Sequence, residues 1–156
     1  MTHSPELEPF GIPLEEPSTM TKRSRATAVV EHEGRIVLTE TRHGLILLPG
    51  GGINRGEPPL AAAVRELDEE TGLVATQGIY LFEHESPSNR HFVFWLSATG
   101  APTPRDDAVA LHFLARDEQP GPLRLSPATH EILRKYLALT NANRDLFAML
   151  AALEAG

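Results

Sequence analysis

The sequence of 156 residues predicts an α/β fold in which helices sandwich a mixed β-sheet. Short apolar runs separated by turn residues are typical of strands. Residues 58–71, in the middle of the chain, have the composition and apolar spacing of a helix. Two more helical patterns follow residue 125. Because no internal repeat or domain boundary is found, we expect residues 22–156 to form a single domain that includes a C-terminal helix.

The first segment, residues 1–21, differs from the rest because proline and glutamate dominate it. Proline removes backbone donors, and the segment has too little apolar surface to form a core. We expect a flexible or extended arm. An alternative is that the arm lies across a neighbouring subunit. Met20 is a second candidate for the translational start.

The first strands are predicted on both sides of a tight turn. Residues 26–32 and 35–41 read as strands, and Glu33-Gly34 between them is a turn, so a hairpin is expected. Residues 45–48 form a short buried strand that leads into the glycines at 50–52.

A second hairpin is predicted from residues 79–84 and 91–96, which a Ser-Pro-Ser-Asn segment joins. Residues 100–107, with prolines and aspartates, are expected to form a loop. Residues 109–114 form a further strand.

The helices after residue 125 have recognisable start signals. Ser126 is a suitable N-cap and Pro127 a suitable first residue. The apolar side of this helix is Ile132, Leu133, Tyr136 and Leu137. Asn143 is expected to cap a last helix. The apolar stripe of that helix, which covers the core or a subunit interface, is Leu146, Phe147, Met149, Leu150 and Leu153.

The central helix begins and ends at residues that favour those positions. Pro58 and Pro59 suit a first turn, whose N–H groups lack intrahelical partners, and Gly72 suits a left-handed end. The stripe predicted to pack inward is Leu60, Val64, Leu67 and Thr71.

A second stripe of this helix is acidic: Arg65, Glu66, Glu69 and Glu70. Like charges at spacings of three and four destabilise a helix, and negative charge near its C-terminus opposes the helix dipole. One interpretation is a solvated acidic face. The other is a divalent cation, because carboxylate oxygens are the ligands that Mg²⁺ and Mn²⁺ prefer.

The spacing of these residues resembles the Nudix box. Gly51 is followed after five residues by Glu57, and after seven more by the segment Arg65–Leu73, which fills every specified position of that motif. The resemblance implies a Nudix-type α/β/α sandwich. It also implies a hydrolase that cleaves a diphosphate linkage with Mg²⁺, or Mn²⁺, and a water nucleophile.

The resemblance assigns roles to individual residues. It implies that Glu69 and Glu70 are the principal metal ligands and that Glu66 is a metal ligand or general base. The carbonyl of Gly50 matches a backbone ligand. Arg65 matches the arginine that orients the glutamates.

Other site residues are less firmly matched. Glu57 is expected to stabilise the loop, with a second role near the metal as the alternative. Asp107 stands six residues before Phe113, where many members of the family place an extra acidic ligand before a tryptophan. A solvent-facing aspartate is the equal alternative.

Several basic residues are candidates for binding the substrate. Arg42 follows the second strand, where the family often places a phosphate-binding arginine, and Arg25 and Arg90 are weaker candidates. Of the histidines, His43 and His91 are the best placed for a ligand.

Composition excludes several classes of function. The net charge of −7 argues against nonspecific nucleic-acid or membrane binding, and the absence of cysteine excludes thiolate chemistry. The apolar runs are too short to span a bilayer, and the N-terminus lacks a signal-peptide pattern. A cytoplasmic protein, with a homodimer possible, is expected.

The motif indicates the reaction and leaves the substrate open. We expect a nucleoside di- or triphosphate or a related nucleotide derivative. Residues 50–52 and 89–94 loosely resemble hydrolases of dinucleoside polyphosphates and diphosphoinositol polyphosphates, which are the alternatives. A noncatalytic, nucleotide-sensing module is the alternative from another class. An enzyme is favoured because a repulsive carboxylate cluster is hard to explain without a metal.

Overall fold

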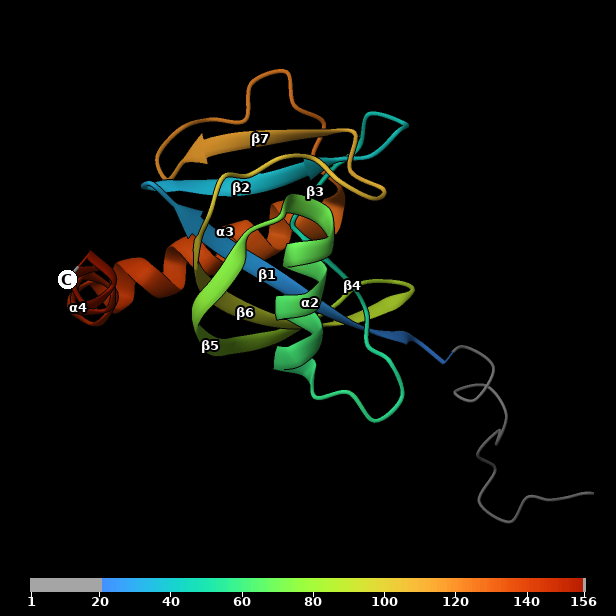
Figure 1. Cartoon of the computed structure of the whole chain (residues 1–156), viewed down its shortest axis with the longest axis horizontal. Coiled ribbons are helices and arrows are strands. Elements are labelled where there is room, and N and C mark those ends of the chain that lie inside the picture. Colours follow the sequence, from blue (N-terminus) through green and yellow to red (C-terminus); the bar gives the residue numbers. More distant parts are fainter. Residues whose placement is uncertain (1–20, 156) are drawn as a thin grey trace, which may run out of the picture.

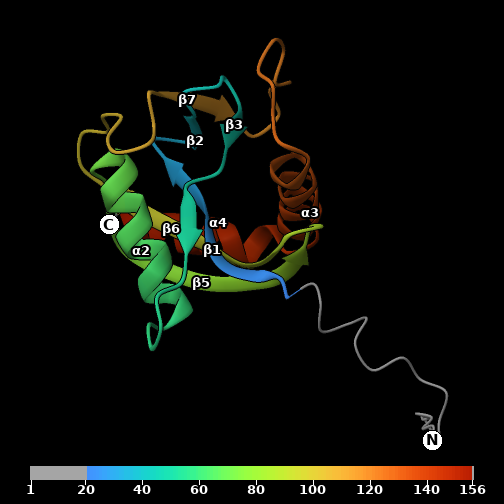
Figure 2. The same ribbon diagram turned by 90° about the vertical axis from the view of Figure 1, so that its right-hand side faces the viewer.

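The structure of the protein, a computed structural model, describes residues 21–155, with side chains up to Leu153 (Figures 1 and 2). The predicted arm over residues 1–21, apart from Thr21, and the alternative start at Met20 lie outside the described residues. The strands are β1 (Arg23–His32), β2 (Arg35–Glu40), β3 (Ile46–Leu47), β4 (Gly50–Gly52), β5 (Val74–Glu85), β6 (Asn89–Thr99) and β7 (Ala110–Ala115). The described helices are α2 (Pro59–Thr71), α3 (Pro127–Ala142) and α4 (Arg144–Ala155).

The strands form one seven-stranded mixed sheet. The order is β3-β2-β1-β6-β5, with β4 paired to β1 and β7 paired to β2. β1 and β6 are parallel, and the other named pairs are antiparallel. Figure 2 shows α2 and α3 on opposite sides of this sheet. The predicted α/β fold with a mixed, helix-sandwiched sheet is confirmed.

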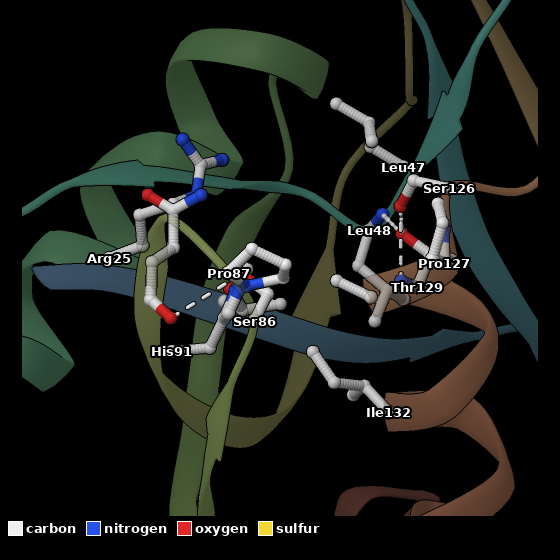
Figure 3. Close-up of a pocket in the computed structure, with 13 residues that line it drawn as sticks. Arg25, Leu47, Leu48, Ser86, Pro87, His91, Ser126, Pro127, Thr129 and Ile132 are labelled. Atoms are coloured by element: carbon white, nitrogen blue, oxygen red, sulfur yellow. Dashed lines mark hydrogen bonds between the residues drawn. The ribbon is translucent and has the colours of Figure 1, made fainter. Parts of the chain in front are cut away.

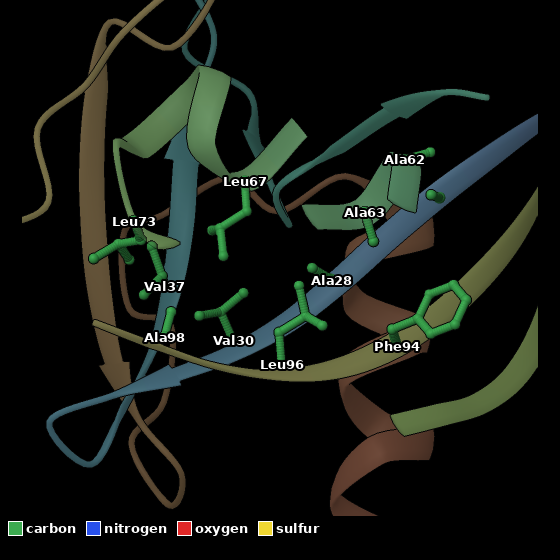
Figure 4. Close-up of a cluster of buried hydrophobic side chains, with 11 residues drawn as sticks. Ala28, Val30, Val37, Ala62, Ala63, Leu67, Leu73, Phe94, Leu96 and Ala98 are labelled. Carbon is green, nitrogen blue, oxygen red and sulfur yellow. The ribbon is translucent and has the colours of Figure 1, made fainter. Parts of the chain in front are cut away.

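The central strand β1 serves both faces of the sheet because side chains alternate along a strand. Ala26, Ala28 and Val30 belong to the core beneath α2, which Figure 4 shows. Val29, between them, belongs to the core beneath α3. Small side chains on β1 let α2 approach the sheet closely, and this approach brings the acidic stripe of α2 next to β4.

The predicted start of α3 is confirmed. The Ser126 side chain accepts a hydrogen bond from the Thr129 N–H (3.0 Å), and Pro127 is the first helical residue. The Thr129 hydroxyl in turn accepts from the Leu48 N–H (3.3 Å). The start of α3 is thereby connected to Leu48, which precedes β4.

The end of α3 differs from the prediction. The Asn143 side chain donates to the Leu139 carbonyl (3.0 Å), so it closes α3 and does not cap α4. On α4, Phe147 and Leu150 pack on the core beneath α3. The other members of the predicted stripe are exposed: Leu146, Met149 and Leu153.

The buried face of α2 also differs from the predicted stripe. Ala62 and Ala63 are fully buried with Leu67 and Thr71, whereas Leu60 is 39% exposed. The helix lies so close to β1 that small side chains fill the interface. The prediction placed Leu60 inside because it is large and apolar. The sequence does not show how close the neighbouring strand lies, and at this distance the small alanines fill the interface.

The strand β4 is absent from the predictions, since glycine has a low preference for strands. It forms because β1 offers a partner, with Ala26 opposite Gly51. β5 also begins earlier than predicted, at Val74. Within residues 21–155, no helix is long and apolar enough to cross a membrane.

Candidate active site

The helix α2 is held at both ends and along one side. Pro58 is its N-cap position, and Gly72 ends it with a φ of 75° and an N–H bond to the Asp68 carbonyl (2.8 Å). A left-handed φ is strained for residues other than glycine, which explains Gly72. The buried Thr71 hydroxyl donates to the Leu67 carbonyl (2.7 Å) and accepts from the Leu73 N–H (3.0 Å).

Arg65 is the centre of a hydrogen-bond network on the exposed side of α2. Its Nε and Nη2 atoms donate to the two carboxylate oxygens of Glu57 (2.8 and 2.9 Å). Its Nη1 atom donates to Glu66 (3.1 Å) and Glu69 (3.2 Å), and Nη2 also donates to the Gly52 carbonyl (3.1 Å). One guanidinium therefore ties the loop, β4 and two glutamates together.

Glu57 completes the connection between this network and the loop before α2. Its Oε1 atom also accepts from the Asn54 N–H (2.9 Å), which closes the turn. The hydrogen bonds from Arg65 and Asn54 lower the pKa of Glu57 to about 2. The same contact with Glu57 raises the pKa of Arg65. Both groups therefore stay charged across the ordinary pH range.

Glu66 and Glu70 lie against the glycine strand. The Glu66 carboxylate occupies the space beside the Cα of Gly51 that a Cβ atom would need. The Glu70 carboxylate accepts from the Gly50 N–H (3.2 Å). Burial, together with the neighbouring Glu66 charge, raises the pKa of Glu70 to about 8, although the Gly50 N–H and Arg25 oppose this change.

The donor types at this position suit a hard divalent cation. Carboxylate oxygens and a backbone carbonyl are the ligands that Mg²⁺ prefers, and two neighbouring carboxylates gain from a cation between them. Within residues 21–155, no group of three or more His, Asp and Glu side chains is already gathered as a metal cage. Glu69, whose side chain is 46% exposed, is bonded to Arg65.

Asp107 lies on a loop that is fastened to the end of α2. The Arg105 N–H donates to the Glu70 carbonyl and the Thr103 N–H to the Thr71 carbonyl, both at 2.9 Å. Asp107 itself is exposed. The loop predicted at 100–107 is present, and it brings Asp107 to the same end of α2 as Glu70.

The three arginine candidates separate in the structure. Arg42 is exposed in the turn after β2. Arg90 is also exposed, and it faces Glu85 at 3.6 Å. Arg25, on β1 opposite Gly52, lowers the pKa of Glu70 through its charge and also lines a cavity. Arg25 is therefore the arginine that connects the carboxylates to a cavity.

This cavity has a volume of about 320 Å³ and opens on the α3 side of the sheet (Figure 3). It lies between the start of β1, the turn joining β5 to β6, and the start of α3. Its lining residues are Arg25, Thr27, Leu47, Leu48, Ser86, Pro87, Asn89, His91, Ser126, Pro127, Ala128, Thr129 and Ile132. Arg25 and His91 were candidates from the sequence.

The α3 residues of the cavity were not predicted as part of a site. The only sequence signal for them was the N-cap pair Ser126-Pro127. This pair predicts where a helix begins and does not indicate that the beginning of the helix lines a cavity. His43 does not line this cavity.

Comparisons with known proteins agree with this geometry. The family profile of the NUDIX domain matches residues 20–142. A protein from Chromobacterium violaceum assigned to the Nudix hydrolase family is 33% identical, with 86% of this chain and 92% of that chain covered and a TM-score of 0.75.

Two further structures are similar at lower identity. The ORF135 protein of E. coli is 27% identical over 80% of this chain and 95% of its own, with a TM-score of 0.65. A MutT Nudix hydrolase from Burkholderia pseudomallei is 27% identical over 73% of this chain and 97% of its own, with a TM-score of 0.60. Nudix hydrolases are generally Mg²⁺- or Mn²⁺-dependent pyrophosphohydrolases of nucleotide derivatives. The match over most of its length shows that this chain belongs to the Nudix hydrolase family.

Proposed function

We propose that this protein is a Mg²⁺-dependent hydrolase that cleaves a phosphoanhydride linkage in a nucleoside di- or triphosphate or a related nucleotide derivative. The observation that carries the proposal is the position of Arg25. Arg25 pairs with Gly52 of the glycine strand against which Glu66 and Glu70 lie, and it also lines the cavity on the α3 side of the sheet. A phosphate held by Arg25 would have the carboxylates on one side and space for its substituent on the other.

The metal ligands in this proposal are Glu66, Glu69, Glu70 and the carbonyl of Gly50. Glu66 and Glu70 already lie at the glycine strand, and Glu69 would leave Arg65 to join them. A bound Mg²⁺, or Mn²⁺, would neutralise phosphate charge and polarise the scissile linkage. Asp107 is the proposed additional acidic ligand because its loop is bonded to the Glu70 carbonyl.

Glu66 is the proposed general base. Arg65 donates to its Oε2 atom, which fixes the carboxylate that would accept a proton from the attacking water. Arg65 acts by holding Glu66 in place and by keeping Glu69 near the site until a metal binds. Arg25 binds a phosphate of the substrate, and Arg42 and Arg90, which are exposed at the ends of β2 and β6, are secondary candidates.

The test is hydrolysis by the full chain in Mg²⁺, measured as release of phosphate or pyrophosphate. The substrates are nucleoside triphosphates, nucleotide sugars, dinucleoside polyphosphates and diphosphoinositols. We expect turnover of a nucleotide substrate that Glu66→Gln abolishes without unfolding the protein. The matched control is Glu131→Gln on α3, which leaves turnover unchanged.

Turnover that persists in Glu66→Gln would contradict the proposed site. Tight nucleotide binding without turnover of any substrate would favour the noncatalytic sensor.

We also propose a cytoplasmic protein that acts on a small molecule, without nucleic-acid or membrane partners and with a homodimer as the candidate assembly. Light scattering of the purified chain tests the homodimer.

A further inference from the structure

The cavity beside Arg25 is charged at one end and neutral elsewhere. Among the described residues that line it, only Arg25 has a fully charged side chain. The rest of the surface consists of aliphatic side chains, hydroxyl groups, the Asn89 amide and the His91 imidazole (Figure 3). This distribution suits a ligand with phosphate at one end and an uncharged remainder.

His91 lines this cavity, and its two ring nitrogens have different partners. The residue is 7% exposed, and its Nδ1 atom is 2.9 Å from the Thr27 hydroxyl, which fixes the ring. Its Nε2 atom is 3.5 Å from the Ser86 hydroxyl, at the limit of a hydrogen bond. Nε2 is therefore the nitrogen that a ligand can engage by shifting only the Ser86 hydroxyl.

A second buried histidine, His84, lies next to His91. His84 is 8% exposed, and its ring centroid lies 5.8 Å from that of His91. The Lys135 ammonium on α3 lies 2.9 Å from His84 Nδ1 and donates to it. Arg25 is the register partner of His91 on the neighbouring strand β1.

These surroundings hold both rings neutral. Burial, then the charge of Arg25, lowers the pKa of His91 to about 4, and a proton on His84 would oppose its protonation further. Burial, then Lys135, lowers the pKa of His84, and Glu131 opposes this change. Glu131 is itself bonded to Arg134 (2.8 Å). At neutral pH, His91 is a hydrogen-bonding group without charge.

We propose that His91 is a specificity-determining residue that selects substrates whose phosphate-linked group is uncharged and polar, and that Lys135, through His84, is its positioning residue. This inference rests on the proposed function, because it concerns the group attached to the scissile diphosphate. A nucleoside or sugar meets the requirement. A polyphosphorylated group does not, since its additional phosphates would be buried beside neutral walls with one guanidinium to pair them.

Binding of matched product-like probes tests the selection without metal or turnover. The pairs are AMP with adenosine 3′,5′-bisphosphate, and glucose 1-phosphate with glucose 1,6-bisphosphate, measured by calorimetry on the full chain. In at least one pair we expect the monophosphate to bind about tenfold more tightly or better. The same monophosphate shifts the NMR signals of the His91 ring and leaves those of His130 unchanged.

Variants separate recognition from folding. His91→Leu weakens monophosphate binding about tenfold, and His91→Gln, which keeps a neutral hydrogen-bonding group, restores it to within about threefold. Lys135→Met moves the NMR titration of His84 towards higher pH. Arg35→Met on β2, whose guanidinium lies over the Phe113 ring, removes a cation elsewhere and leaves that titration in place.

Bisphosphates that bind as tightly as the monophosphates in both pairs, or an absence of binding, would overturn the inference. Unshifted His91 signals would also overturn it, even if His91→Leu failed to fold. Hydrolysis of a nucleotide without monophosphate binding would leave the proposed function intact and remove this inference. Binding at His91 without hydrolysis would support this inference about the cavity and contradict the proposed function.

Discussion

The carboxylate of Glu66 lies where a side chain on Gly51 would stand. Glycine at position 51 therefore allows the acidic helix to rest directly on β4. The two neighbouring glycines face different surroundings, so the same substitution at each of the three positions has a different expected result.

Gly51→Ala should displace Glu66 and leave the fold intact. The added methyl meets only the end of a flexible side chain, which can rotate away. We expect the free energy of unfolding to change by less than about 1 kcal/mol and turnover to fall at least about a hundredfold. Mn²⁺ binding, followed by electron paramagnetic resonance, should weaken in parallel. Gly52→Ala is the control because a Cβ there meets nothing within 4 Å.

Gly50→Ala should destabilise the protein itself. Its Cβ would meet the Ala26 carbonyl oxygen and lie 3.0 Å from the Thr27 Cα, and this backbone cannot yield without breaking the β1–β4 pairing. We expect a loss of about 2–3 kcal/mol in chemical denaturation. A stability equal to that of Gly52→Ala would show that the two strands are not closely packed in solution.

Arg65→Lys should impair the site although it keeps the charge. A single ammonium cannot reproduce the fork that joins Glu57, Glu66 and the Gly52 carbonyl. We expect turnover to fall at least about tenfold with little change in the substrate KM. Arg55→Lys, in the same loop, is the control. Wild-type kinetics in Arg65→Lys would mean that the network does not orient the glutamates.

Acidification should destabilise the protein through His91. The pKa of His91 is about 4 in the folded state, below the ordinary value of 6.5, so the unfolded chain binds more protons between these values. Stability from this group is complete above about pH 6.5 and is lost as the pH falls towards 4. Between about pH 7.5 and about pH 5, wild type should lose roughly 2 kcal/mol more than His91→Gln. Urea denaturation of both proteins at the two pH values measures this difference, and parallel losses would refute it.

Ser126→Ala should weaken the start of α3. It removes the acceptor of the Thr129 N–H and should cost about 1 kcal/mol, whereas Ser126→Asp should cost less. Thr129→Val leaves the Leu48 N–H without its partner at a buried position, with an expected cost of about 1–3 kcal/mol. Thermal melts of the three variants compare these contributions. Equal melting temperatures for Ser126→Ala and wild type would argue against the cap.

The sequence predicted those parts of the fold in which local pattern and tertiary packing agree. Ser126 begins α3 and Gly72 ends α2 through contacts with their own neighbours, and both were identified in advance. Asn143 is a residue type that often serves as an N-cap, yet its side chain donates to the Leu139 carbonyl of the preceding helix. The residue stands between two helices, and its side chain can serve only one of them.

The candidate site divides in the same way. The contact of Arg65 with Glu69 follows from their helical spacing of four, and the motif identified Arg65 as the residue that orients the glutamates. The cavity joins residues near positions 25, 90 and 127, which only the folded sheet brings together. Periodicity within one element contains no information about such distant neighbours, so Thr129 and Ser86 could not be found.

The parallel pairing of β1 with β6 has a consequence for how the protein is made. Arg23 pairs with Asn89 and Glu31 with Ser97, so the middle of the sheet closes only after most of the chain exists. Contacts this distant in sequence are slow to form because a long loop must first be ordered. A ribosome that has reached residue 88 has made the whole motif and the strands β1, β4 and β5 beside α2, but β6, which joins β1 to β5, is still missing. Synthesis of β6 is therefore the step at which the sheet beneath α2 can first close.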